Sequence, residues 1–244
     1  MGLKLLALIK NDSVNQSNLM DMERRIALVF GSTGLIGNLL VEELVKSGKY
    51  SLVKSFVRQS TGVSEAKVEE IVSDLSDPET LSDKINGDDL YICLGTTIKK
   101  AGSVANMEKI DRDLPVRIAT VAASNGVRNL AMVSSVGASA GSSNYYLRIK
   151  GEMEDGILKL EFESISIVRP SMLLGERKEK RMGEIAGKVV MTAVKPLMIG
   201  PLARYRAIHA RDVARAMIAL IQTAKGKNIV ESDRLQALSA EYSK

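Results

Sequence analysis

The chain has 244 residues, of which 45% are hydrophobic and 26% charged, with a formal net charge of +5 at pH 7. This is the composition of a globular domain that is long enough to bury a hydrophobic core. The basic excess is spread along the chain and no apolar run reaches 18 residues, so we expect neither a nucleic acid partner nor an integral membrane segment.

Cysteine and histidine are rare, with one of each in the whole chain. Cys93 cannot form an internal disulfide, which favours a reducing compartment, and we therefore expect a cytoplasmic protein. Because Cys93 lies in the apolar run 90–94, it is expected to be a buried structural thiol. No Cys/His cluster is present, so the sequence predicts no metal site.

The first 24 residues precede the first predicted strand. Residues 3–9 are apolar, but this stretch is shorter than the core of a secretory signal and is followed by polar residues. We interpret residues 1–24 as a weakly helical or unstructured extension, with docking on the body or on a partner left open. Residues 25–244 are expected to form one domain.

Apolar segments alternate with helical patterns from residue 26 onward. Strands are predicted at 26–30, 51–57, 68–72, 89–94, 130–133 and 165–168, and helices at 35–45, 104–125 and 145–160. Asp77-Pro78-Glu79 indicates a further helix start, and Pro115 predicts a kink near Leu114. This alternation predicts an α/β fold with a doubly wound parallel sheet, the Rossmann fold. Residues 170–244, with a segment at 207–214 that resembles the opening of a late helix, a short strand at 228–231 and a last helix at 233–241, are expected to form a small α/β substrate-side part.

A glycine-rich turn follows the first strand. The segment Gly31-Ser-Thr-Gly34-Leu-Ile-Gly37 lies between an apolar strand and an amphipathic helix. Such spacing lets the backbone turn tightly, approach a pyrophosphate and pack the helix close to the strand. The helix N-terminus then offers free N–H groups to the phosphates. We predict dinucleotide binding here, the alternative being a purely structural glycine turn.

Cofactor choice depends on the residue after the second strand. An acid at this point binds the ribose 2′-hydroxyl of NAD, whereas an arginine pairs with the 2′-phosphate of NADP. Arg58 stands here, and positions 57–59 hold no acid. The sequence therefore favours NADP(H), and NAD(H) stays open.

A tyrosine and a lysine are spaced for proton transfer. Tyr146 and Lys150 lie four residues apart on a predicted helix, so they share one face. A lysine ammonium beside a phenol helps a tyrosine exchange a proton near neutral pH. The fifth strand ends in Ser134-Ser135, and we favour Ser135 as the hydroxyl that binds a substrate carbonyl.

These motifs together resemble the atypical branch of the short-chain dehydrogenase/reductase superfamily. The resemblance covers roughly residues 24–220 and is strongest to the group of the Tat-interacting tumour-suppressor oxidoreductase and its fungal and bacterial relatives. The segments that carry it are 31–37, Leu94-Gly-Thr-Thr97, Asp111-Arg-Asp113, Val133-Ser-Ser135, Tyr146-x-x-x-Lys150 and Arg169-Pro170. It implies a Rossmann fold, NADPH binding and Tyr146 as proton donor. The chain departs from this group at Gln59, where a second basic residue is usual, and this weakens the NADP preference.

The expected site residues follow from strand ends and from the resemblance. Position at the carboxyl ends of strands selects Gly31, Gly34, Gly37, Arg58, Asp74, Gly95, Thr96, Ser135, Pro170 and Leu173. The resemblance implies nucleotide contacts from Ser32, Thr33, Leu35, Ile36, Arg58, Leu94, Gly95, Lys150 and Leu173, and from Arg181 in the charged run 176–181, which is otherwise read as a solvated loop or a lid.

Two functions from different classes are expected to account for these residues. The first is an NADP(H)-dependent oxidoreductase that acts on a small carbonyl or alcohol, with Tyr146, Lys150 and Ser135 as the catalytic residues. The second is an NADP(H)-binding regulatory module that acts through a protein partner without turnover. A nucleotide-sugar epimerase or dehydratase ranks lower, because only about 75 residues follow Pro170. The substrate is left unidentified, and a homodimer stays open.

Overall fold

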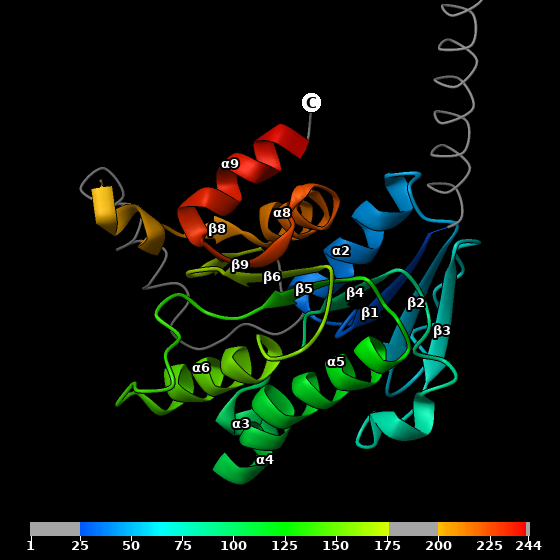
Figure 1. Ribbon diagram of the computed structural model, residues 1–244, viewed down its shortest axis with the longest axis horizontal. Coiled ribbons are helices and arrows are strands. Elements are labelled where there is room, and N and C mark those ends of the chain that lie inside the picture. Colours follow the sequence, from blue (N-terminus) through cyan, green and yellow to red (C-terminus); the bar gives the residue numbers. More distant parts are fainter. Residues whose placement is uncertain (1–24, 176–199, 243–244) are drawn as a thin grey trace, which may run out of the picture.

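The computed structural model describes residues 25–175 and 200–242. These residues form a seven-stranded sheet in the order β3-β2-β1-β4-β5-β6-β9, in which every neighbouring pair is parallel (Figure 1). The strands are β1 (Ile26–Phe30), β2 (Leu52–Val57), β3 (Val68–Val72), β4 (Asp89–Ile92), β5 (Asn129–Val133), β6 (Ser164–Arg169) and β9 (Gly226–Glu231). The predicted Rossmann fold is confirmed.

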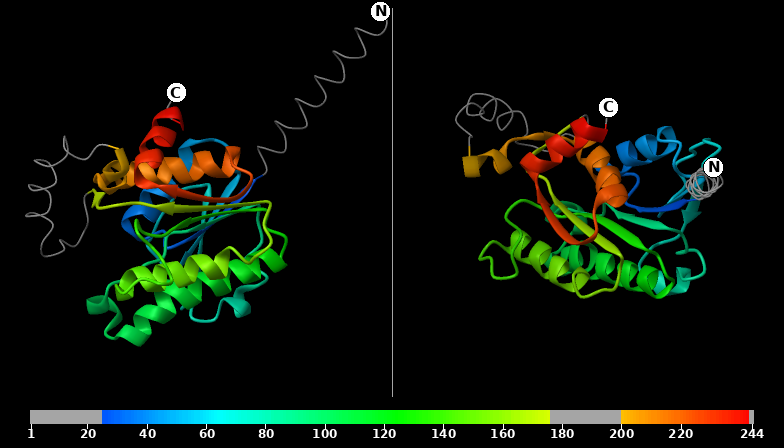
Figure 2. Two further views of the ribbon diagram at one scale, coloured as in Figure 1. Left: turned by 60° about the vertical axis from the view of Figure 1, so that its left-hand side comes forward. Right: turned by 45° about the horizontal axis from the view of Figure 1, so that its top comes forward.

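Helices cover both faces of the sheet, as Figure 2 shows from two sides. One layer contains α2 (Leu35–Lys46), α8 (Ala210–Thr223) and α9 (Ser232–Tyr242). The other contains α3 (Ile98–Ala101), α4 (Val104–Glu108), α5 (Leu114–Ser124), α6 (Tyr145–Ile157) and the 3₁₀ turn η1 (Pro78–Leu81). Alternate residues of β1 enter different cores: Ala27 and Val29 face the α2/α8 layer, and Leu28 and Phe30 face the α5/α6 layer. Two buried faces explain why β1 is apolar throughout.

The helix expected at 104–125 contains a π-helical segment, η2 (Lys109–Asp113), between α4 and α5. The Leu114 N–H donates to the Lys109 carbonyl, five residues back. Pro115, at the start of α5, has no N–H to donate, so the regular ladder is interrupted near this point. The kink expected near Leu114 is thus a widened helical turn. This turn contains Asp111, a residue of the candidate site.

The C-terminal part completes the domain. β9 adds the seventh strand beside β6, and α8 packs on α2 and on the sheet. The short strands β7 (Leu173–Leu174) and β8 (Ile208–His209) pair in a separate two-stranded sheet, and the 3₁₀ segment η4 (Gly200–Tyr205) precedes β8. Whether residues 170–244 act as a substrate-side part stays a prediction. The N-terminal extension 1–24 lies outside the described residues.

The amino edge of the sheet is closed by a buried polar cluster. The Asp89 carboxylate is fully buried and accepts hydrogen bonds from Arg25, from the Tyr50 hydroxyl at 2.6 Å and from the Asn129 amide at 2.9 Å. The Tyr50 and Tyr91 hydroxyls are 2.9 Å apart, and burial raises the pKa of both phenols well above the usual value. Arg25 Nε is buried without a hydrogen-bond partner, but the other polar groups named here bind one another. This cluster occupies the amino edge, whereas ligands of open α/β sheets bind beyond the carboxyl ends of the strands.

Candidate functional site

The order of the strands reverses between β1 and β4. From β1 the chain proceeds to β2 and β3 on one side, and then returns to β4 on the other. In open α/β sheets, ligands bind in the crevice at this point, beyond the carboxyl ends of the strands. The glycine turn 31–37 follows β1 at this crevice, and the segment 93–97 follows β4 beside it.

Two glycines of the turn cannot be replaced without moving the backbone. Gly31 has φ +84°, and a Cβ on it would lie 2.7 Å from the Cys93 carbonyl carbon and oxygen. A Cβ on Gly37 would lie 2.1 Å from the Gly31 carbonyl oxygen. The turn is therefore packed against the end of β4 on one side and against α2 on the other, as a dinucleotide-binding turn requires.

The N-terminus of α2 is free of competing groups. No side chain caps it, and no acidic residue lies in its first turn. Ser32 is buried and accepts a hydrogen bond from the Ser55 hydroxyl of β2 at 2.7 Å, whereas Thr33 and Gly34 are exposed and Leu35 is half-buried. Ile36 is buried in the core beneath the turn. Free N–H groups at a positive helix end suit a pyrophosphate.

Arg58 and Asp74 lie at the carboxyl ends of the adjacent strands β2 and β3. The Ser73 N–H donates to the Val57 carbonyl at 2.9 Å, which continues the register between the two strands. Arg58 is exposed, and no hydrogen bond or ion pair within the described part of the chain holds its guanidinium. The Asp74 carboxylate accepts from the Ser76 N–H at 2.7 Å, and this bond lowers the pKa of Asp74.

A buried ion pair lies on the other side of the crevice. The Lys150 ammonium of α6 is 2.8 Å from Asp111 Oδ1 in the π-helical segment, and the two side chains are 3% and 1% exposed. Asp111 Oδ2 accepts from the Thr96 N–H at 2.9 Å, and Gly95 lies against the same carboxylate. Asp111 thus joins α6 to the loop after β4. From the sequence, Lys150 was paired with Tyr146 and with the nucleotide, and the structure adds a carboxylate partner, Asp111.

Tyr146 and Ser135 are accessible at the same edge. Tyr146, in the first turn of α6, is 38% exposed, and within the described residues its hydroxyl has no hydrogen-bond partner. The neighbouring Tyr145 hydroxyl instead contacts the Val104 carbonyl at 3.4 Å. Ser135 is half-buried, whereas Ser134 is buried with its hydroxyl unpartnered. The Val136 N–H donates to the Pro170 carbonyl, which places Pro170 beside the loop that contains Ser135.

The remaining expected residues complete the edge. Leu173 is half-buried in β7, and a Cβ on the nearby Gly175 would lie 3.0 Å from Leu35 of α2, so this segment reaches the glycine turn. Leu94 is half-buried after β4. Desolvation raises the pKa of the adjacent Cys93 thiol to about 12. Cys93, expected to be buried, is half-buried and packs against the core of the α2/α8 layer. Arg181 lies outside the described residues.

From the sequence, Asp111 is named only as part of a family-like segment and is given no role. A second buried charge pair was not predicted. Glu154, one turn after Lys150 on α6, accepts two hydrogen bonds from Arg169 at the end of β6. Arg169 also contacts Glu231 of β9 at 3.2 Å. Glu154 lies four residues after Lys150 on the same helix face, and this spacing was the available signal. Asp111 and Arg169 thus connect α6 to the π-helical segment and to β6.

The sheet order, the glycine turn and the uncapped helix define a Rossmann-type nucleotide-binding domain. The sequence profile of a family described as NAD(P)H-binding matches residues 31–224. Among the similar proteins, FMP52 of Eremothecium gossypii is 33% identical over 220 residues, covering 87% of this chain and 96% of that protein. HTATIP2 of Rattus norvegicus is 32% identical over 167 residues, covering 67% and 69%. The chain belongs to the NAD(P)H-binding Rossmann family and is homologous to the FMP52 and HTATIP2 proteins.

Solved structures share the fold at lower identity. MoeE5 in complex with UDP-glucose and NAD has a TM-score of 0.63 at 17% identity, covering 89% of this chain and 81% of that one. The structure of gox2253 has a TM-score of 0.64 at 22% identity, covering 90% and 76%. These structures support the Rossmann fold for this chain. The UDP-glucose and NAD of MoeE5 were bound to that protein and are not evidence for a ligand of this chain.

The comparisons correct the expected location. FMP52 of Eremothecium gossypii and FMP52 of Candida albicans, both 33% identical to this chain, are named mitochondrial proteins. The cytoplasmic prediction is therefore wrong. Its physical basis was insufficient, because a lone cysteine excludes an internal disulfide but does not distinguish one reducing compartment from another.

No helix in the ranges 25–175 and 200–242 has the length and apolar character needed to cross a bilayer. Within the same ranges, no three acids, histidines or cysteines cluster in a way that could hold a metal ion.

Proposed function

We propose that this chain is an NADP(H)-dependent oxidoreductase of the short-chain dehydrogenase/reductase type, which transfers a hydride between the nicotinamide and a small carbonyl or alcohol. One observation carries the proposal. A buried, paired Lys150 lies one helical turn beyond an accessible Tyr146, beside the loop after β4 and at the edge where the glycine turn opens. Fungal relatives named mitochondrial support the same location for this chain.

The residues present fit a dinucleotide. The uncapped N-terminus of α2 would hold the pyrophosphate, and Gly34, the N-cap residue of this helix, has no Cβ to obstruct it. Arg58 would bind the adenosine ribose phosphate at the end of β2. Lys150, Leu94 and Pro170 would lie toward the nicotinamide half, on the β4-β5-β6 side of the sheet. When bound, the nicotinamide supplies or accepts the hydride.

The protein's own residues would then control the proton. In the reducing direction the carbonyl carbon gains the hydride pair, the π electrons of the C=O bond move to oxygen, and the Tyr146 hydroxyl gives its proton to that oxygen. Ser135 would orient the oxygen by a hydrogen bond. Lys150 stabilises the phenolate left on Tyr146, and Asp111 holds Lys150 in place. In the oxidising direction each transfer runs backwards.

A substrate panel tests the proposal. Aldehydes, ketones and quinones are offered with NADPH, and the loss of reduced-nicotinamide absorbance is followed. Turnover of any of them supports the oxidoreductase. NADPH binding without turnover on any compound would overturn it and favour the regulatory module that acts through a protein partner.

Cofactor choice gives a sharper prediction. The Arg58 guanidinium can bind a 2′-phosphate by paired charge-assisted hydrogen bonds, and it has no partner within the described residues to compete. Solvent weakens such bonds, so we expect a preference for NADPH over NADH of roughly tenfold to a hundredfold. Replacing Arg58 with alanine should remove this preference by weakening NADPH binding alone, as titration calorimetry with both cofactors would measure.

Arg128→Ala serves as the control for this titration. Arg128 precedes β5 at the amino edge of the sheet and pairs with Asp88, so both affinities should stay as in the wild type. Equal wild-type affinity for NADH and NADPH, or an equal loss of both in Arg58→Ala, would show that Arg58 does not select the cofactor.

A further inference from the structure

The loop after β3 contains a residue with an unfavourable backbone conformation, which other contacts must stabilise. Leu75 has φ +63°, a left-handed conformation that is unfavourable for a leucine. Its side chain is 5% exposed and packs in the core of the α5/α6 layer. The neighbouring Asp74 is exposed just after β3, and Leu75 lies between it and Ser76, which binds the Asp74 carboxylate.

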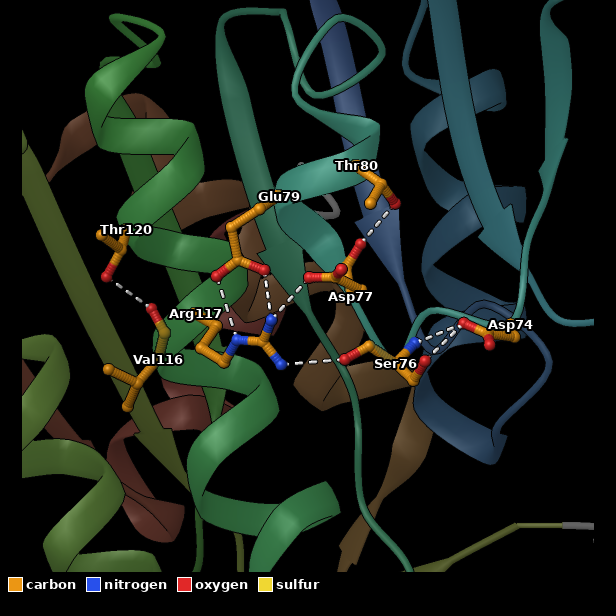
Figure 3. A network of polar contacts seen from close by, with 8 residues as sticks. All are labelled: Asp74, Ser76, Asp77, Glu79, Thr80, Val116, Arg117 and Thr120. Carbon is orange, nitrogen blue, oxygen red and sulfur yellow. Dashed lines mark hydrogen bonds and ion pairs between the residues drawn. The ribbon is translucent and has the colours of Figure 1, made fainter.

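Ser76 is held from both of its sides, as Figure 3 shows. Its N–H and its hydroxyl donate to Asp74 Oδ1, at 2.7 and 2.8 Å. Its carbonyl oxygen accepts from Arg117 Nη1 at 2.9 Å. The loop therefore depends on one side chain from a distant helix.

Arg117 uses the whole guanidinium for this loop. Besides the Ser76 carbonyl, Nη2 donates to Asp77 Oδ1 at 2.7 Å, and Nε donates to Glu79 Oε1 at 3.0 Å (Figure 3). The hydrogen bond from Arg117 lowers the pKa of Glu79 to about 2, so the pair stays charged in mildly acidic solution as well as at neutral pH. The base of Arg117 is rigid, because the adjacent Ile118 and Val121 of α5 are buried in the core beneath the sheet. A planar guanidinium that makes this many hydrogen bonds fixes both the orientation of the loop relative to α5 and its distance from α5.

The loop lies on the adenosine half of the site. β3 and β2 are on the side of β1 that carries Arg58, away from the half with Lys150. Asp74 Oδ1 is used by Ser76, and within the described residues Oδ2 makes no hydrogen bond. A free carboxylate oxygen at this edge can accept from an amino group such as that of adenine.

We propose that Arg117 is a positioning residue for the adenosine half of the nucleotide: by holding Ser76, Asp77 and Glu79 it sets the backbone at Leu75 and presents Asp74 to the adenine. This assignment rests on the proposed function. It predicts that Arg117 affects the adenosine half and leaves the nicotinamide half alone, because within the described residues every hydrogen bond of the Arg117 guanidinium goes to the loop after β3 and to η1.

Two fragments of the cofactor separate these halves. Adenosine 2′,5′-bisphosphate probes the adenosine half, and reduced nicotinamide mononucleotide probes the other. We expect Arg117→Met to weaken binding of the first fragment and of NADPH about three- to tenfold, with the affinity for the mononucleotide unchanged in calorimetry. Arg117→Lys keeps the positive charge but loses the planar guanidinium. Its affinity for the adenosine fragment should therefore lie between that of Arg117→Met and that of the wild type. Arg128→Met is the matched control, since its side chain is 46% exposed against 43% for Arg117 and it also pairs with an acid.

The outcomes are distinct. Selective loss of the adenosine fragment in Arg117→Met, with Arg128→Met unchanged, supports the assignment. Unchanged affinity for that fragment in Arg117→Met overturns it, and so does an equal loss of both fragments, which would indicate a general loss of structure. A wild-type chain that binds neither fragment nor NADPH would refute the proposed function and this assignment with it.

Discussion

Replacing Tyr146 with phenylalanine is expected to lower kcat about 10²–10⁴-fold, the usual contribution of general acid catalysis, with the Kd for NADPH nearly unchanged. The substitution removes one hydroxyl and keeps the ring. Tyr146 is 38% exposed, so the loss of its oxygen should leave the fold intact. Lys150 keeps its ion pair with Asp111, and the ribose contact expected of it is retained. Single-turnover rates and calorimetric titration of the same preparation measure the two quantities.

Tyr145→Phe is the matched control for this experiment. The two tyrosines are adjacent on α6, but the Tyr145 hydroxyl contacts the Val104 carbonyl and its ring lies near the Arg148 guanidinium. Turnover by Tyr145→Phe should therefore stay within about twofold of the wild type, since surface contacts of this kind contribute little. If the two variants lose equal activity, or if Tyr146→Phe loses none, Tyr146 is not the proton donor.

The fold could be predicted because its main signals are local. An apolar strand, three glycines and an amphipathic helix follow one another within residues 26–46, and the tightest contact of the turn, between the position of a Cβ on Gly37 and the Gly31 carbonyl oxygen, lies inside this segment. Strands at 68–72 and 129–133 were placed within one residue for the same reason. The sequence also places Arg58 and Asp74 at neighbouring strand ends, and the register between β2 and β3 agrees.

What could not be predicted depends on contacts between distant segments. The helix expected from Asp77 is only the four-residue turn η1, whose acid Glu79 is bound to Arg117 of α5. A charged residue in a helix ordinarily indicates a solvated face, so the burial of Asp111 has no local signal, and only the π-helical segment turns it inward. The ladder between β7 and β8 is two residues long, too short to produce a pattern.

Replacing Asp111 with asparagine is expected to destabilise the folded protein by about 3–5 kcal/mol, the usual cost of leaving one partner of a buried ion pair uncompensated. The side chains of Asp111 and Lys150 are both at least 97% buried, and the Asp111 carboxylate also binds the Thr96 N–H. Because asparagine has nearly the same shape as aspartate, the substitution creates no cavity. The change in the free energy of unfolding therefore reports the loss of the negative charge. The free energy of unfolding in urea gives the value, and Asp83→Asn is the control, because the exposed pair of Asp83 with Lys84 should contribute only about 0–1 kcal/mol.

A double-mutant cycle separates the charge from the scaffold. In Asp111→Asn combined with Lys150→Met the buried ammonium is removed together with its partner, so no uncompensated charge remains. We expect the double variant to recover most of the stability lost in Asp111→Asn, so that the loss in the double variant is far smaller than the sum of the two single losses. Simple addition of the two single losses would contradict the pairing, and would mean that Asp111 acts through the Thr96 N–H alone. Recovery of stability without recovery of turnover would indicate that the pair serves catalysis. Asp111 would then keep a charged Lys150 inside the protein, one helical turn from Tyr146. A neutral side chain at position 150 would be more stable there but could not stabilise the phenolate.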